Sequence, residues 1–88
     1  MTATESLLQF PTDFPLKIMG RKTDAFTQEM VALVRQHAPD FDASTVEMRP
    51  SKNGNYLSLT CTIQATSQAQ LDDLYRALSS HPLVSFVL

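Results

Sequence analysis

Apolar and polar side chains alternate on both sides of the dipeptide Asn53-Gly54. This dipeptide is the strongest short signal for a β-hairpin, because a type I′ turn requires positive φ at both central residues. A turn there pairs Pro50 with Leu57 and places the aliphatic side chains of both strands on one face: Val46, Met48, Pro50, Leu57, Leu59, Cys61, Ile63 and Ala65. The opposite face is polar. Pro50 cannot donate to the ladder, so we expect the first strand at a sheet edge and the second in the centre.

Two other segments show the 3.6-residue period of amphipathic helices. Thr23 or Asp24 is expected to cap the first helix, which Ala38-Pro39 ends. Ser67 begins a capping-box pattern for the second helix, which runs to about Leu78. The expected apolar stripes are Phe26, Met30, Leu33, Val34 and His37 in the first helix and Leu71, Leu74, Tyr75 and Leu78 in the second.

The remaining apolar segments predict two more strands. Residues 16–19 form a short strand that Gly20 ends, and residues 83–88 form the last one. The order β-α-β-β-α-β predicts an α+β, ferredoxin-like two-layer sandwich: a four-stranded antiparallel sheet with both helices on one face. The first and third strands are expected in the centre. We assign residues 1–13 to an N-terminal tail and residues 14–88 to a single domain.

Composition narrows the classes of function. The chain has 88 residues, a net charge of -2 and a pI near 5.5, which argue against nucleic-acid binding through bulk charge. A single cysteine predicts no internal disulfide and fits a reducing cytoplasm. The N-terminus carries an acidic residue and only a short apolar run, which predicts neither a signal peptide nor a membrane span. We therefore expect a cytoplasmic protein.

Residues that could carry catalysis do not form a known pattern. Asp72 and Asp73 are adjacent in a predicted helix and therefore point in different directions, so they do not form an acid–base pair. Gly20 and Gly54 are the only glycines, too few for a phosphate-binding loop. We predict a protein that is not an enzyme, with no catalytic residues and no cofactor.

Metal-binding and redox residues also have simpler interpretations. His37 and His81 lie far apart without a third ligand at zinc spacing. Asp40 and Asp42 alternate in a loop that lacks the oxygen ligands and the glycine of a calcium site. Cys61 falls on the apolar face of a central strand, where a thiol packs as a small hydrophobic group. We therefore predict no metal site and an inert thiol.

The segment Gly20-Arg21-Lys22 is a candidate anion site, because it lies between a predicted central strand and a helix N-terminus. Free N–H groups, the positive end of the helix dipole and two cations favour a carboxylate or phosphate there. Strand parity places Lys17 and Arg49 on the polar sheet face, where they extend the basic patch. The sequence allows two interpretations of these five residues: a solvated basic loop, or a site that binds a small anionic metabolite, which is the hypothesis we carry forward.

The last strand is apolar on both faces, and such an edge is usually covered or paired. This predicts a homodimer or an unknown protein partner, with an interaction surface of Tyr56, Ser58, Thr60, Leu83 and Val87. Alternatively, Leu7, Leu8 and Phe10 cover the strand within the monomer. RNA binding is less favoured, because Tyr56 is the only aromatic residue expected on the polar face of the central strands.

Several segments resemble the YbeD family of small bacterial proteins. They are Phe10-Pro11, Phe14-Pro15-Leu16-Lys17-Ile18-Met19-Gly20, His37-Ala38-Pro39 and Ser51-Lys52-Asn53-Gly54-Asn55-Tyr56-Leu57-Ser58, and with the closing strand they extend the similarity from about Leu7 to Leu88. The turn departs from the expected pattern, because Asn53 separates Lys52 from Gly54. The resemblance implies a ferredoxin-like fold close to ACT domains, the amino-acid-sensing modules of metabolic enzymes, but it implies no activity.

Members of this family are often encoded near the lipoate-attachment enzyme, so the resemblance also hints at a role in lipoate metabolism. The residues and the resemblance together predict a non-enzymatic regulatory module of bacterial metabolism that senses a small anionic metabolite. The alternatives are a protein-interaction domain without a ligand and, less favoured, an RNA-binding module.

Overall fold

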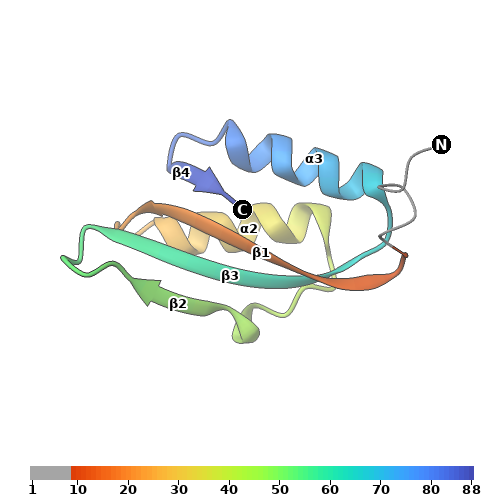
Figure 1. Ribbon diagram of the computed structural model, residues 1–88, viewed down its shortest axis with the longest axis horizontal. Helices are drawn as coiled ribbons and strands as arrows, with labels where there is room; N and C mark the ends of the chain where they lie inside the picture. Colours follow the sequence, from red (N-terminus) through yellow and green to blue (C-terminus); the bar gives the residue numbers. More distant parts are fainter. Residues whose placement is uncertain (1–8) are drawn as a thin grey trace.

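The sheet and helices follow the predicted order. The computed structural model, which describes residues 9–88, contains β1 (Thr12–Arg21), α2 (Phe26–His37), the 3-10 turn η1 (Ala43–Thr45), β2 (Glu47–Pro50), β3 (Tyr56–Ala65), α3 (Gln68–Ser79) and β4 (Val84–Val87). The four antiparallel strands have the order β2-β3-β1-β4, and both helices cover the same face (Figure 1). The ferredoxin-like sandwich, with β1 and β3 in its centre, is confirmed.

The hairpin has the predicted register, since Pro50 pairs with Leu57. All the predicted inward positions of β3 are buried: Leu57, Leu59, Cys61, Ile63 and Ala65. Burial of β2 differs from the prediction, because all four of its residues are exposed and Met48 is 60% exposed. Met48 does face the helix side, where its sulfur lies 3.8 Å from Thr27 Oγ1. The helices do not extend far enough to cover this edge strand.

The predicted type I′ turn is wrong. The Ser51 N–H donates to the Tyr56 carbonyl, so residues 52–55 form a four-residue loop. Within it the Gly54 N–H donates to the Ser51 carbonyl, and Gly54, with φ of 79°, is the only residue among 9–88 at positive φ. Two-residue and four-residue loops centred on the same dipeptide give the same strand pairing, which is why the register was nevertheless correct.

Strand β1 is longer than the four residues predicted from Leu16 to Met19. It begins at Thr12, inside the segment assigned to the tail, and continues through Gly20. Its proline is tolerated for a geometric reason. Lys17 exchanges backbone hydrogen bonds with Leu88, so Lys17 and Pro15, two residues apart, both turn their nitrogens away from β3. Pro15 lies beyond the end of β4, where no ladder bond is lost.

The two helices begin in different ways. The predicted side-chain cap of α2 is wrong: Ala25 occupies the N-cap position, and Thr23 contributes only its carbonyl, which accepts from the Phe26 N–H. The cap of α3 is confirmed, because Ser67 Oγ accepts from the Gln70 N–H at 3.1 Å. The Gln70 side chain makes further bonds, accepting from the Thr66 N–H at 2.7 Å and donating to the His37 carbonyl at 2.8 Å. It therefore links the start of α3 to the end of α2.

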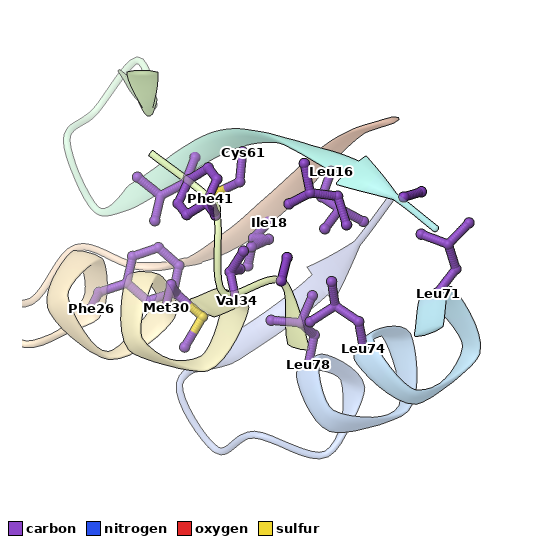
Figure 2. Close-up of a cluster of buried hydrophobic side chains, with 14 of the residues drawn as sticks. Leu16, Ile18, Phe26, Met30, Val34, Phe41, Cys61, Leu71, Leu74 and Leu78 are labelled. Atoms are coloured by element: carbon purple, nitrogen blue, oxygen red, sulfur yellow. The ribbon is translucent and has the colours of Figure 1, made fainter. Parts of the chain in front are cut away.

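The core fills the space between the helices and the inner face of the sheet (Figure 2). Its largest fully enclosed side chains are Leu16, Ile18, Phe26, Met30, Val34, Leu59, Cys61, Ile63, Leu71, Leu74 and Leu78. Three members of the predicted stripes, Leu33, His37 and Tyr75, are only half-buried. Within residues 9–88, no helix is both long enough and apolar enough to cross a membrane.

Candidate functional site

The sheet face turned away from the helices, which we call the open face, presents the alternate side chains of all four strands. Burial alternates along β1 and β3, which identifies these side chains. Cross-strand pairing arranges them in rows: Phe86, Met19, Ser58 and Arg49 in one row, and Leu88, Lys17, Thr60 and Glu47 in the next. The short hydroxyl side chains of β3 lie between longer side chains on β1 and β2. This difference in length produces a depression along β3.

The depression contains a hollow of about 350 Å³, lined by Lys17, Glu47, Met48, Arg49, Ser58 and Thr60. A second hollow of about 190 Å³ adjoins it and shares Lys17, Arg49 and Ser58 with it, and Met19 and Tyr56 also line it. The larger hollow lies at the lower end of the range of small-molecule sites, about 300–1,000 Å³. The open face therefore has room for a small ligand at its centre.

The larger hollow carries a net positive charge. Among residues 9–88 an ion pair joins Arg76 to Asp73, and His81 Nε2 lies 3.6 Å from Glu29 Oε1; neither contact involves Lys17 or Arg49. Glu47 is the single acidic side chain in the lining. Lysine and arginine are protonated at neutral pH, and the neighbouring hydroxyls supply further donors. The arrangement therefore favours a carboxylate or a phosphate over a cation.

Gly20, the first residue of the predicted anion loop, has a packing role. It is buried within β1, and a Cβ there would overlap the Leu83 carbonyl oxygen and lie 2.5 Å from Phe26 Cε1. The absence of a side chain lets the Phe26 ring and the backbone of residue 83 pack against the strand. The sequence pattern alone does not distinguish this role from a backbone approach to a ligand.

Arg21 and Lys22 are also not at a helix N-terminus. Arg21 is the last residue of β1, and its guanidinium carbon lies 5.7 Å from the centre of the Tyr56 ring. The Lys22 N–H donates to the Asn55 carbonyl at 3.0 Å, and α2 begins only at Phe26. Of the five residues predicted to bind an anion, the structure places only Lys17 and Arg49 around the hollow.

The predicted interaction surface is divided between two faces. Tyr56, Ser58 and Thr60 lie on the open face, whereas Leu83 and Val87 are half-buried against the core. The sequence reading missed Phe86 and Leu88, which are 48% and 65% exposed. A β-bulge explains the difference: the pairs Met19–Phe86 and Gly20–Val84 leave Ser85 as an extra residue, so Val84 and Val87 both face the core.

The other candidate groups have structural partners. Cys61 is fully buried, and burial raises the pKa of its thiol to about 11, so it lacks the thiolate that a nucleophile requires. Asp42 begins η1, where its Oδ1 accepts from the Ser44 hydroxyl and N–H; these bonds lower the pKa of the Asp42 carboxyl. His81 Nδ1 accepts from the Leu83 N–H. In the part of the chain that the structure describes, His, Cys, Asp and Glu form no cluster of three that could hold a metal ion.

Comparisons with known proteins agree with this architecture. The family model described as "Protein of unknown function (DUF493)" matches residues 5–88. The UPF0250 protein NE1487 of Nitrosomonas europaea is 58% identical over 84 residues, which cover 96% of this chain and 97% of the relative. A UPF0250 protein of Bordetella pertussis is 57% identical over 84 residues, with 96% of this chain and 92% of the relative covered.

Solved structures with low sequence identity share the fold. Protein HP0495 from H. pylori has a TM-score of 0.74 at 16% identity, with 92% of this chain and 85% of that chain covered. The ACT domain from the GTP pyrophosphokinase of Chlorobium tepidum has a TM-score of 0.64 at 19% identity, with 86% and 84% covered. The chain therefore belongs to the uncharacterised DUF493 family with its UPF0250 relatives, the YbeD family that its motifs resemble, and its ferredoxin-like fold is ACT-like.

Proposed function

We propose that this protein is a non-catalytic regulatory module of bacterial metabolism, acting in the cytoplasm, whose open face binds a small anionic metabolite. The observation that carries the proposal is the hollow between Lys17 and Arg49, two cations without a carboxylate partner among residues 9–88. Neighbouring strands are about 4.8 Å apart, so β1 and β2 are separated by roughly 10 Å. Two long side chains from these strands can contact one anion above the hydroxyls of β3.

The fold supports a binding module. The sheet holds Ser58 and Thr60 in place, while the charged side chains on either side remain exposed. One structural neighbour is the ACT domain of a GTP pyrophosphokinase, so a domain of this fold accompanies a metabolic enzyme in that protein. The family resemblance adds lipoate to the anions worth testing. A metabolite bound at the hollow would change the charge of the open face and thus what the face can contact.

An NMR titration tests the proposal. Amide shifts of the labelled protein are followed with inorganic phosphate, citrate, lipoate and amino acids. We expect at least one anion to shift the amides of Lys17, Ser58 and Thr60, and the double variant Lys17→Gln/Arg49→Gln to bind it at least tenfold more weakly. The matched control is Lys22→Gln/Lys52→Gln, which removes the same charge from residues outside the hollow. Equal affinity of the two double variants, or no shifts with any compound, would contradict the proposal.

A second candidate function is a protein-interaction domain. Phe86 and Leu88 favour it, because both side chains are exposed on the same face as the hollow. This function does not require the metabolite, and the two can also operate together.

A further inference from the structure

An apolar strip lies beside the hollow, on the β4 side of the open face. It consists of Met19, Phe86 and Leu88, and the last two are 48% and 65% exposed. Neither Phe86 nor Leu88 lines the hollow or its neighbour. A small molecule in the hollow therefore leaves the strip uncovered. Exposed apolar clusters bordered by polar groups are typical of interaction sites.

The open face also carries cations next to the strip. Lys17 on β1 and Arg49 on β2 line the hollow, against one negative charge from Glu47; Arg21 lies on the same face at the end of β1, and Asp13 lies on it near the start of that strand. Arg21, Lys17 and Arg49 are all exposed. The complement of this face is a surface with an apolar stripe and carboxylates along one side of it.

We propose that the open face docks an acidic amphipathic helix of another protein, and that the helix and the anion in the hollow exclude each other. Alternate residues of a strand are about 6.8 Å apart, and helix residues i and i+4 are about 6 Å apart. A helix aligned with the strands can therefore place successive apolar side chains over Phe86 and Leu88, while its carboxylates contact Lys17 and Arg49. It would supply the helical layer that this face of the sheet lacks.

A second copy of this chain is a poorer occupant. The apolar stripes of α2 and α3 are already buried in the core, and the outward positions of these helices are mainly polar or charged. Two open faces in contact would bring two sets of cations together. Within the described residues, neither the helices nor the open face of another copy complements the strip and the cations.

The exclusion follows from shared charges and rests on the proposed function. An anion in the hollow neutralises Lys17 and Arg49, the groups that would contact the carboxylates of the helix. The anion therefore weakens binding of the helix, and the helix weakens binding of the anion by the same factor, as thermodynamic linkage requires. The module would release its partner when the metabolite is abundant.

Fluorescence anisotropy with a labelled synthetic peptide tests the docking surface. The probe is a 14-residue helix with leucine at i, i+4, i+7 and i+11 and glutamate beside this stripe; its counterpart carries lysine in place of glutamate. We expect the acidic peptide to bind, and both Phe86→Ser/Leu88→Ser and Lys17→Gln/Arg49→Gln to weaken binding at least tenfold. The control, Lys22→Gln/Lys52→Gln, removes the same charge as Lys17→Gln/Arg49→Gln from residues outside both hollows and should change affinity less than twofold. Amide spectra confirm that each variant is folded.

A competition experiment tests whether the anion and the helix exclude each other. An anion that shifts the amides of the hollow should weaken peptide binding tenfold at saturation, whereas Phe86→Ser/Leu88→Ser should keep the anion shifts. Peptide binding without any anion binding would retain the docking surface and overturn both the exclusion and the proposed function. If an anion binds but the protein has equal affinity for the acidic and the lysine peptides, the proposed docking surface is overturned and the proposed function is retained.

Three other occupants give different results, each of which overturns the choice of a foreign helix. Sedimentation that shows a dimer lost in Phe86→Ser/Leu88→Ser would identify a second copy. A single-stranded RNA oligonucleotide that binds more tightly than the peptide and loses affinity in both double variants would identify a nucleic acid. A chain that begins at Gln9 and binds the peptide tenfold more tightly than the full chain would identify the N-terminal segment of the same molecule.

Discussion

Gly20 shows how a single residue allows a central strand and a helix to approach each other. Its buried backbone lies against the Phe26 ring and the Leu83 carbonyl, both of which would overlap a Cβ. At Gly54 the backbone conformation, and not the space for a side chain, requires glycine. Nothing lies within 4 Å of a Cβ built there, but its φ of 79° is one that other residues adopt with strain.

The two glycines therefore differ in their expected response to alanine. Gly20→Ala should lower the free energy of unfolding by about 2–3 kcal/mol, because the ring and a backbone carbonyl must move in a packed core. Gly54→Ala should lower it by about 1 kcal/mol, the cost of a left-handed backbone alone. Urea denaturation measures both values. A loss at Gly54 equal to or greater than that at Gly20 would contradict this account.

Burial of Cys61 predicts a dependence of stability on pH. The folded thiol has its pKa raised to about 11 from an ordinary 9.0, so the unfolded chain loses the proton first as pH rises. The stabilising contribution of the buried thiol to the free energy of unfolding is complete below pH 9 and is lost between pH 9 and 11; at about 1.4 kcal/mol per pKa unit it is about 3 kcal/mol. Denaturation curves across this range should show the loss in the wild type and a smaller slope in Cys61→Ala. Equal slopes would refute the assignment.

Among the elements, α3 has a side-chain cap and α2 has none. Ser67 Oγ accepts the Gln70 N–H, whereas Ala25 at the start of α2 makes no such bond. The Asp and Thr residues before α2 resemble caps in sequence, but the chain leaves β1 late and begins the helix two residues beyond them. A Thr or Asp before a helix therefore suggests a cap, but it does not show at which residue the helix begins.

Ser67→Ala is expected to lower the free energy of unfolding by about 1 kcal/mol, because one N–H of the first turn loses its acceptor. Thr23→Ala removes a hydroxyl that caps nothing and should change stability by less than about 0.5 kcal/mol. Thermal or urea denaturation of the pair gives the comparison. An equal effect of the two substitutions would show that the assigned cap contributes no stability.

For the whole molecule, one face of the sheet is packed and the other is bare. The helices cover β1 and β3, while all residues of the edge strand β2 are exposed. Stability should therefore be unevenly distributed, because local opening of an edge strand exposes little buried apolar area.

Hydrogen exchange followed by NMR should reveal this gradient. Amides of β3 bonded to β1 should exchange only through global unfolding, whereas amides of β2 bonded to β3 should exchange at least tenfold faster through local opening. Equal protection of the two strands would show that β2 opens only with the core. The exchange rates also show which amides lie in segments that do not open locally. Shifts of these amides in a titration then report ligand binding itself.

The candidate site was predictable only in part. The orientation of Lys17 and Arg49 followed from strand parity, and both line the hollow. The role of Gly20 and the exposure of Phe86 did not follow, because the first depends on a ring six residues away and the second on a bulge at Ser85. No local pattern in the sequence marks either feature.

The order of elements, the hairpin register and most of the buried positions of the helices follow from the amino-acid sequence, because the two-residue period of a strand and the 3.6-residue period of a helix are local properties of the chain. The length of β1 depends on the assembled sheet, because its first residues are held by pairing with β3, and so does the exposure of the apolar residues of β4. The hollow likewise depends on the tertiary structure, since Lys17, Arg49 and Thr60 come from three strands that meet only when the sheet is assembled.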